Sequence, residues 1–392
     1  MNIDVSSNRD LDPVSLAQKL IRCKSVTPCD DGVVDLAAGF LRSVGFQTHI
    51  IESGPPDWHI KNLYAKFGHR SPNLAVIGHL DVVPAGNMSD WKYDPFAAYI
   101  EDGILTGRGS VDMKSGFACA AVAAKSIVDR SFDGAISFLV TGDEEVGTEH
   151  GTRAILKWCF DRSIKFDACL VAEPTGTGNL GQAFCIGHRG SLNVELASRG
   201  IQGHVANPEK ASNPLTPLIE YLHFMKAKIW DKGDGIFPPT NLEITSIDVG
   251  NSTPNLIPSS AQAKLNIRYN RLHSAESLIK DLKLARNFFS PSPDNLSIEA
   301  QYNSDFFICE DKSLINNMFS AIKEVLEIEP KISAGGGTTD GRFISKYCPV
   351  VEFGVPEDEM HKANESIAVN DLIKLTEIYK VFYKNFFGTK FK

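Results

Sequence analysis

The chain has 392 residues, of which 43% are hydrophobic and 22% charged, and its formal net charge at pH 7 is −8. This length suggests two domains, or one domain with a large insertion, and this composition is that of an ordinary globular protein with a sizeable core. Because the balance is acidic and shows no basic stripe, it argues against nucleic acid or an anionic membrane as the main partner.

The first half of the chain alternates short apolar runs with helical patterns. We expect strands at 63–67, 73–83, 135–142 and 166–174, and helices at 114–130 and 149–162. Continuous apolar strands separated by helices predict an α/β fold with a mostly parallel sheet, covered by helices on both faces. Such sheets place their sites beyond the carboxyl ends of the strands, so the polar residues that follow each apolar run are the candidates.

The pattern changes after residue 188, where apolar and polar residues begin to alternate. We expect half-exposed strands at 190–200, 241–250, 261–270 and 296–302, and helices at 215–229 and 274–289, the latter capped by Ser274. The order β-α-β-β-α-β is the ferredoxin-like arrangement. Residues 189–303 are therefore predicted to be a second domain, inserted between the first part (1–188) and the second part (304–392) of the first domain.

Polar residues follow the apolar runs in order along the chain. They are His79 and Asp81, Asp112, Glu144 and Glu145, Glu173 and, much later, His361. Histidines and carboxylates at strand ends offer nitrogen and oxygen donors suited to zinc or a related divalent ion. The candidate ligands are five: His79, Asp112, one of Glu144 and Glu145, Glu173 and His361. Five ligands are too many for one tetrahedral ion with an open position, but they suit two ions bridged by a carboxylate, about 3.5–4 Å apart.

Three acids, Asp143, Glu144 and Glu145, follow one another directly after an apolar run. Their mutual repulsion is tolerable if metal ions lie among them. A site with two divalent ions is near neutral only if one of these acids is a ligand and another stays free, and a free carboxylate beside a metal-bound water can act as a general base.

His79 and Asp81 lie on the same side of an extended chain, so Asp81 is predicted to accept a hydrogen bond from the second nitrogen of a ligand histidine. For an isolated His-x-Asp, a residue of a strand-end turn is an equally good interpretation. The glycine-rich stretch 335–343 has free backbone N–H groups and is predicted to contact an anionic substrate. Asp102 and Gly103 are predicted to form a hairpin turn.

The chain resembles the M20 family of metallopeptidases and deacylases over nearly its whole length. The resemblance rests on motifs in the family's order, namely HLDVVPAG, DGILTGRGSVDMKSG, TGDEEVGTEHGT, VAEPTG, GIQGHVANP, STPNLIP, GGGTTDGRFI and HKANESI. It implies a catalytic domain with a mostly parallel mixed sheet flanked by helices, and an inserted ferredoxin-like α+β domain that serves as lid and dimerisation domain. It also implies two Zn²⁺ ions per subunit, with Co²⁺ able to substitute.

The resemblance implies a role for each ligand position. Asp112 would bridge the two zinc ions. His79 and Glu173 would complete one site, and Glu145 and His361 would complete the other.

The resemblance also implies the catalytic and substrate-binding residues. Glu144 would be the general base and acid, and Asp81 the partner of His79. His204, which by itself would be an ordinary loop histidine, would stabilise the oxyanion in the active site of the other subunit of a homodimer. The residues that match positions holding substrate carboxylates are Arg189, Asn255, Arg268, Gly337 and Thr338.

Within the family, the motifs are most similar to those of bacterial enzymes that hydrolyse the amide of N-succinyl-LL-2,6-diaminopimelate to succinate and LL-2,6-diaminopimelate, in lysine and peptidoglycan-precursor biosynthesis. The alternatives are another N-acyl amino acid deacylase of the acetylornithine deacetylase type, and an M20 exopeptidase. A non-catalytic binding protein on the same fold should have lost a ligand or the base, and this chain retains both.

The location in the cell is predicted from three further features of the sequence. The N-terminal region has no signal-peptide pattern, no apolar run has the length of a membrane span, and the eight cysteines form no CxxC pair. These features predict a cytoplasmic enzyme with reduced thiols.

Overall fold

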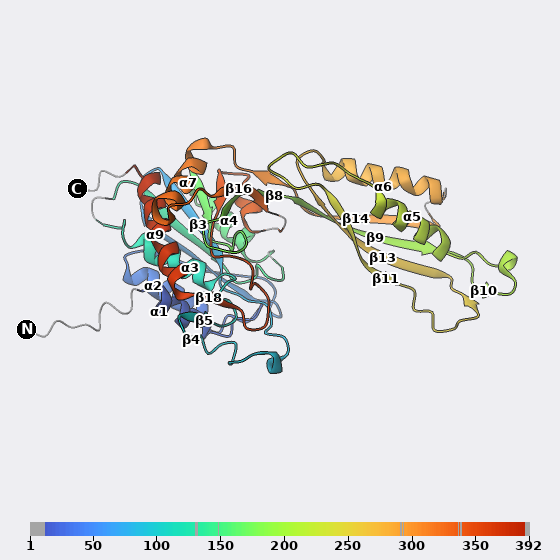
Figure 1. The fold of residues 1–392 in the computed structure, drawn as a ribbon, viewed down its shortest axis with the longest axis horizontal. Coiled ribbons are helices and arrows are strands. Elements are labelled where there is room, and N and C mark those ends of the chain that lie inside the picture. Colours follow the sequence, from blue (N-terminus) through green and yellow to red (C-terminus); the bar gives the residue numbers. More distant parts are fainter. Residues whose placement is uncertain are drawn as a thin grey trace, which may run out of the picture. The chain divides into compact units, whose positions relative to one another are not determined.

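The computed structural model describes residues 12–129, 132–147, 149–290, 292, 294–335, 337 and 339–388 (Figure 1). Its chain forms two compact units. The first contains the described residues of 1–187, 308–333 and 339–392, and the second those of 188–307 and 334–338. The sequence predicts an insertion at 189–303. The second unit instead runs over 188–307 and also contains the described residues of 334–338.

The first unit is built on a mixed sheet, in which the described residues form nine strands. In sheet order these are β1 (Gln47–Ser53), β2 (Ile60–Gly68), β6 (Ala135–Thr141), β3 (Asn73–His79), β7 (Ala168–Val171), β17 (Val350–Glu352), β8 (Ala183–His188) and β15 (Phe307–Ile308), with β16 (Lys331–Gly335) also paired to β8. The central strands β6, β3, β7 and β17 run parallel, whereas β1, β2 and β8 join antiparallel. The sheet is therefore the mixed, mostly parallel one that the sequence predicts.

Helices flank this sheet in two packed groups. One group is α1 (Pro13–Ile21), α3 (Lys114–Ala124), α7 (Lys312–Leu326) and α9 (Val369–Phe386), and the other is α4 (Thr152–Phe160) with α8 (Gly341–Ile344), while α2 (Val33–Ser43) packs on β1 and β2. Every residue of α3, β3 and β6 is buried. Strands covered on both faces need apolar side chains throughout, which explains their unbroken apolar runs.

Some predicted elements of the first unit are shorter in the structure. The strand predicted over 73–83 ends at His79, and the strand predicted over 166–174 contains only Ala168–Val171. The helix predicted over 114–130 ends at Ala124, because the N–H groups of Lys125, Ser126 and Ile127 bond three residues back in a tighter turn. The helix predicted over 149–162 begins only after Gly151.

The strands of a small antiparallel sheet adjoin, along the chain, the loops that carry Asp112 and His361. This sheet contains β18 (Ser366–Ala368), β5 (Ile104–Thr106) and β4 (Tyr99–Glu101). Asp102 and Gly103 join β4 to β5 with φ angles of 50° and 77°, so the predicted hairpin turn is confirmed and has the conformation that favours glycine.

The second unit has the predicted ferredoxin-like order. Its antiparallel sheet contains, in spatial order, β11 (Asn241–Asp248), β13 (Ser260–Tyr269), β9 (Gly190–Arg199) and β14 (Leu296–Ser304), with α5 (Leu215–Ala227) and α6 (Ala275–Phe289) on one face (Figure 1). Ser274 caps α6 by accepting a hydrogen bond from the N–H of Ser277, as predicted. A separate pair, β10 (Gly203–His204) and β12 (Leu256–Ile257), lies beyond β9. No helix in the described part of the chain has both the length and the apolar character needed to cross a membrane.

Candidate metal centre

The five predicted metal ligands come together at the carboxyl ends of the parallel strands of the first unit. His79 is the last residue of β3, Glu145 follows β6 and Glu173 follows β7. Asp112 lies in the loop before α3, and His361 in the loop before β18. This edge is where the sequence predicts a site, because parallel neighbours end on the same side of the sheet.

The first group of donors is buried. His79 Nε2 lies 2.8 Å from Asp112 Oδ1 and 3.6 Å from Glu173 Oε1. The side chain of His79 is only 1% exposed. These nitrogen and oxygen atoms face a common space, as the ligands of a single cation do.

The second group of donors shares Asp112 with the first. His361 Nε2 lies 3.0 Å from Asp112 Oδ2 and 3.2 Å from each oxygen of Glu145. The side chain of His361 is 44% exposed. The second group is therefore open to solvent at His361, while the side chains of Asp112 and Glu145 are only 8% and 5% exposed. The two oxygens of Asp112 point to different histidines.

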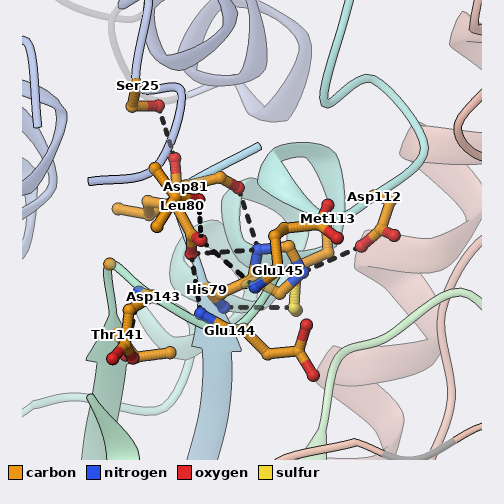
Figure 2. A network of polar contacts seen from close by, with 12 residues as sticks. Ser25, His79, Leu80, Asp81, Asp112, Met113, Thr141, Asp143, Glu144 and Glu145 are labelled. Atoms are coloured by element: carbon orange, nitrogen blue, oxygen red, sulfur yellow. Dashed lines mark hydrogen bonds and ion pairs between the residues drawn. The ribbon is translucent and has the colours of Figure 1, made fainter. Parts of the chain in front are cut away.

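Asp81 organises the loop that carries the adjacent acids (Figure 2). Its carboxylate accepts hydrogen bonds from the N–H groups of Glu144 and Glu145, both at 3.2 Å, and from the Thr27 hydroxyl at 2.7 Å. The Nδ1 atom of His79 lies 2.9 Å from the main-chain oxygen of Asp81 but 3.5 Å from its carboxylate. The main-chain oxygen is thus the nearer hydrogen-bond partner of this histidine, and the carboxylate holds the Glu144–Glu145 backbone.

The ionisable groups of the site shift one another strongly. Burial lowers the pKa of His79, but Glu173 and Asp112 outweigh it, so the pKa lies well above its usual value. Hydrogen bonds to Asp112 and Glu145 raise the pKa of His361 to about 10. Burial raises the pKa of the Glu144 and Glu173 carboxyls well above their usual value. The neighbouring carboxylates therefore favour the protonated form of both imidazoles, whose positive charge would offset part of the negative charge of the site.

The donor sets fit a pair of divalent cations. In each of the groups His79–Asp112–Glu173 and Asp112–Glu145–His361, one ligand atom per residue lies within 4.8 Å of the others. Imidazole and carboxylate donors in this combination suit zinc and related ions, and one carboxylate common to two sets suits a bridged pair.

Comparisons with known proteins decide the family. The profile of "Peptidase family M20/M25/M40" matches residues 75–385. The chain belongs to this family. It is 43% identical over 380 residues to the succinyl-diaminopimelate desuccinylase of Ehrlichia chaffeensis, covering 96% of this chain and 99% of that protein.

Solved structures show the same fold. An M20 family metallo-carboxypeptidase from Sulfolobus solfataricus superposes with a TM-score of 0.76 at 18% identity, covering 96% of this chain and 99% of that one. A Bacillus subtilis protein, described as a dinuclear metal binding peptidase from the M20 family, superposes with a TM-score of 0.71 at 12% identity, covering 94% and 96%. The chain therefore has the fold of these two M20 proteins. Besides the two groups described above, Cys185, His188 and Glu352 also bring ligand atoms within 4.8 Å of one another.

The predicted substrate residues of the M20 chain lie in the second unit, in two separate places. Near the start of β9, Arg189 donates to the Asn241 side chain at 2.7 Å, and Asn241 pairs with Arg268 across the sheet. Gly337 joins this group, because its carbonyl oxygen lies 2.8 Å from the His188 ring. Thr338 lies outside the described residues.

His204 and Asn255 lie together in the β10–β12 region. The N–H of Val205 donates to the Asn255 carbonyl at 3.2 Å, and His204 pairs with Leu256. His204 is exposed and accepts a hydrogen bond from the Ala206 N–H at its Nδ1 atom. The two sets of residues are thus held by different ends of the second unit.

Two parts of the centre are absent from the sequence predictions. Thr27, which bonds Asp81, is separated from it by 54 positions and lies in no motif. Glu365 is within the HKANESI motif, but its partners Arg108 and Val111 come more than 250 positions earlier. A short motif carries no signal for such a contact.

Proposed function

We propose that this M20 chain hydrolyses N-succinyl-LL-2,6-diaminopimelate to succinate and LL-2,6-diaminopimelate, as a cytoplasmic homodimer with two Zn²⁺ ions per subunit. The observation that carries the proposal is the sharing of Asp112 between two donor sets, in a chain 43% identical to a desuccinylase over nearly its whole length. The zinc pair would be held by His79, Asp112, Glu173, Glu145 and His361. Bound there, it would supply Lewis-acid polarisation of the amide and a water of lowered pKa.

Glu144 is proposed to move the proton of the reaction. Its backbone is fixed by Asp81, and its carboxyl lies outside both donor sets. Its carboxylate accepts a proton from the attacking water and then delivers it to the leaving amine nitrogen as the amide C–N bond breaks. The new carboxylate belongs to succinate, and the freed amine belongs to LL-2,6-diaminopimelate.

Arg189 and Arg268 are proposed to bind substrate carboxylates. Arg189 bonds the Asn241 side chain, and Asn241 lies opposite Arg268 in the sheet. Burial and the positive charge of Arg268 lower the pKa of Arg189. The Nε atom of Arg189 is buried and has no hydrogen-bond partner among the described residues. A pair of guanidinium groups with an unused donor suits an anionic acyl group, since the fork of a guanidinium matches a carboxylate.

His204 is proposed to donate a hydrogen bond to the oxyanion in the other subunit. Within the second unit, the ten-residue strand β9 separates Arg189 from the β10 loop, a distance of roughly 30 Å at about 3.3 Å per residue. One small substrate does not extend from one group to the other. Action of His204 on the partner's site is therefore the simpler arrangement, and Asn255, beside it, would bind the same substrate.

The first test of the proposal compares substrates. Protein loaded with Zn²⁺ is assayed on N-succinyl-LL-2,6-diaminopimelate and, in parallel, on N-acetylornithine. We expect strong preference for the succinyl substrate, because an acetyl group offers no carboxylate to Arg189 and Arg268. Preference for N-acetylornithine, or hydrolysis of neither, would overturn the desuccinylase while leaving the family intact. Loading with Co²⁺ instead tests whether that ion also supports turnover.

The second test addresses the dimer. Inactive Glu144→Gln protein is mixed with inactive His204→Ala protein under conditions of proven subunit exchange. If His204 acts across the dimer, a mixed dimer contains one site with both groups, and activity returns. A mixture that stays inactive would show that His204 does not act in this way.

A further inference from the structure

A buried carboxylate outside both donor sets holds the loop that carries Asp112. Glu365 is completely buried. Its Oε1 atom accepts hydrogen bonds from the N–H groups of Val111 at 2.7 Å and of Asp112 and Gly109 at 3.1 Å. Its Oε2 atom accepts from Arg108 Nη1 at 2.6 Å and again from Gly109 at 3.1 Å. One side chain thus fixes the peptide N–H groups of Gly109, Val111 and Asp112.

Arg108 balances the charge of Glu365 and is itself held in place. Its side chain is 2% exposed, and its Nη2 atom donates to the Pro84 carbonyl at 3.3 Å. The guanidinium lies 5.3 Å from the centre of the Trp91 ring. A buried ion pair of this kind adds little to stability compared with apolar residues of the same size, so its value lies in fixed geometry.

The backbone around Glu365 is tied to the same region. The Gly107 N–H donates to the Glu365 carbonyl at 2.9 Å, and β18, which begins at Ser366, pairs with β5. The amide of Asn364 accepts from the Lys92 N–H at 2.6 Å and donates to the Asp90 carbonyl at 2.7 Å. Glu365 therefore cannot shift relative to the Asp112 loop without breaking several hydrogen bonds.

His361 lies in the segment that ends at Glu365. Asp112 hydrogen-bonds Glu365 through its own N–H, and its Oδ2 atom lies 3.0 Å from His361 Nε2. The Glu365 carboxylate thus holds the Asp112 backbone directly, and the Glu365 backbone belongs to the same segment as His361.

We propose that Glu365, neutralised by Arg108, is a positioning residue that sets the spacing of Asp112 and His361 and so builds the solvent-facing donor set. This inference rests on the metal centre of the proposed function. It predicts that loss of the carboxylate weakens both bound cations, because Asp112 belongs to both donor sets. The cation of the Asp112–Glu145–His361 set should weaken more, because Glu365 also lies in the segment that carries His361.

The test is Glu365→Gln. A glutamine amide has one acceptor oxygen, so its NH₂ group must face either Arg108 or the three N–H donors at Oε1. Zinc binding is measured by calorimetry on metal-free protein. Hydrogen exchange is measured on the same metal-free protein and read out for the segment 107–113. We expect one zinc equivalent to weaken by about 10- to 100-fold, the other to weaken less, and the 107–113 amides to exchange faster.

The control is Asp167→Asn, which changes a carboxylate that bonds the Asn73 N–H at the other end of β3. It should leave both zinc equivalents and the exchange of 107–113 unchanged. Equal weakening of both equivalents in Glu365→Gln, or no change in either, would overturn the proposal. If wild-type protein binds no zinc pair, it is the proposed function that fails, and the exchange measurement still tests whether Glu365 holds the loop.

Should Glu365→Gln not fold, Arg108→Lys provides the test. It leaves the backbone donors of Glu365 in place but removes the guanidinium that also bonds the Pro84 carbonyl. A smaller loss of affinity, greater for the same equivalent than for the other, is expected, and unaltered binding of both equivalents would contradict the proposal.

Discussion

Replacing Asp81 by asparagine tests how the loop of adjacent acids is held. Asp81 is 1% exposed, and each of its carboxylate oxygens accepts one backbone N–H, Oδ1 from Glu144 and Oδ2 from Glu145. Asparagine has almost the same shape but only one acceptor oxygen. Its NH₂ group must therefore face one of these N–H groups, while the Thr27 hydroxyl can rotate to accept from it.

The expected cost follows from this mismatch. One buried backbone donor left without an acceptor destabilises the protein by about 1–3 kcal/mol. The orientation of His79 should survive, because its Nδ1 atom bonds the main-chain oxygen of residue 81, which the substitution does not change. We expect turnover to fall by about 10- to 100-fold, as when other outer partners of metal sites are removed.

Two measurements separate these effects. Hydrogen exchange of the central strands reports the stability of the metal-free first unit, and calorimetry reports zinc binding. Thr27→Val is the matched control, since it removes one donor to Asp81 and leaves the charge and both backbone hydrogen bonds. If Asp81→Asn lost the His79–Asp112–Glu173 cation while the Glu144–Glu145 loop stayed protected, the carboxylate would be the partner of His79, and this reasoning would be refuted.

Three more predictions follow from the site. Glu144→Gln should keep both zinc equivalents and lose activity by at least about 100-fold, the lower end for general acid–base catalysis; substantial remaining turnover would remove Glu144 from the proton-transfer role. His361→Ala should reduce zinc binding from two equivalents to one tight equivalent by calorimetry, and retention of two would exclude His361 as a ligand. Stability should also depend on pH, because His361 has its pKa raised from 6.5 to about 10: the protonated ring stabilises the metal-free fold fully below pH 6.5, and this contribution is lost as the pH rises toward 10. Denaturation of metal-free protein across this range should show the loss, zinc affinity should increase over the same range because the cation displaces this proton, and a His361→Ala protein should lack the stability change.

The part of the centre that could be predicted from the sequence lies at strand ends. Unbroken apolar runs identify the buried strands β3, β6 and β7, and the rule for parallel sheets then brings together whatever follows them. His79, Glu145 and Glu173 need no further information to be placed at one edge. The exact end of β3 could not be predicted, because Leu80, Val82 and Val83 are as apolar as strand residues. The chain nevertheless leaves the sheet there, and the Val82 N–H bonds the Ser25 carbonyl instead.

The part that could not be predicted depends on contacts distant in the sequence. The apolar residues of the antiparallel strands β1 and β8 follow no clear period. The position of these strands is fixed by their pairing with β2 and β17. The role of Glu365 likewise comes from N–H groups more than 250 positions away. In both cases a residue's environment is supplied by a partner that no local pattern specifies.

The structure explains how three consecutive acids are accommodated after β6. The Asp143 side chain is buried and accepts hydrogen bonds from the Thr141 hydroxyl and the His150 N–H. Burial raises the pKa of this carboxyl to about 6. Glu145 turns to His361, while Glu144 remains between, its backbone held by Asp81. Burial raises the pKa of the Glu144 carboxyl, and positive charge beside it lowers that pKa. A cation bound at the centre therefore favours the ionised carboxylate that accepts a proton, so cation binding and the competence of the general base are linked.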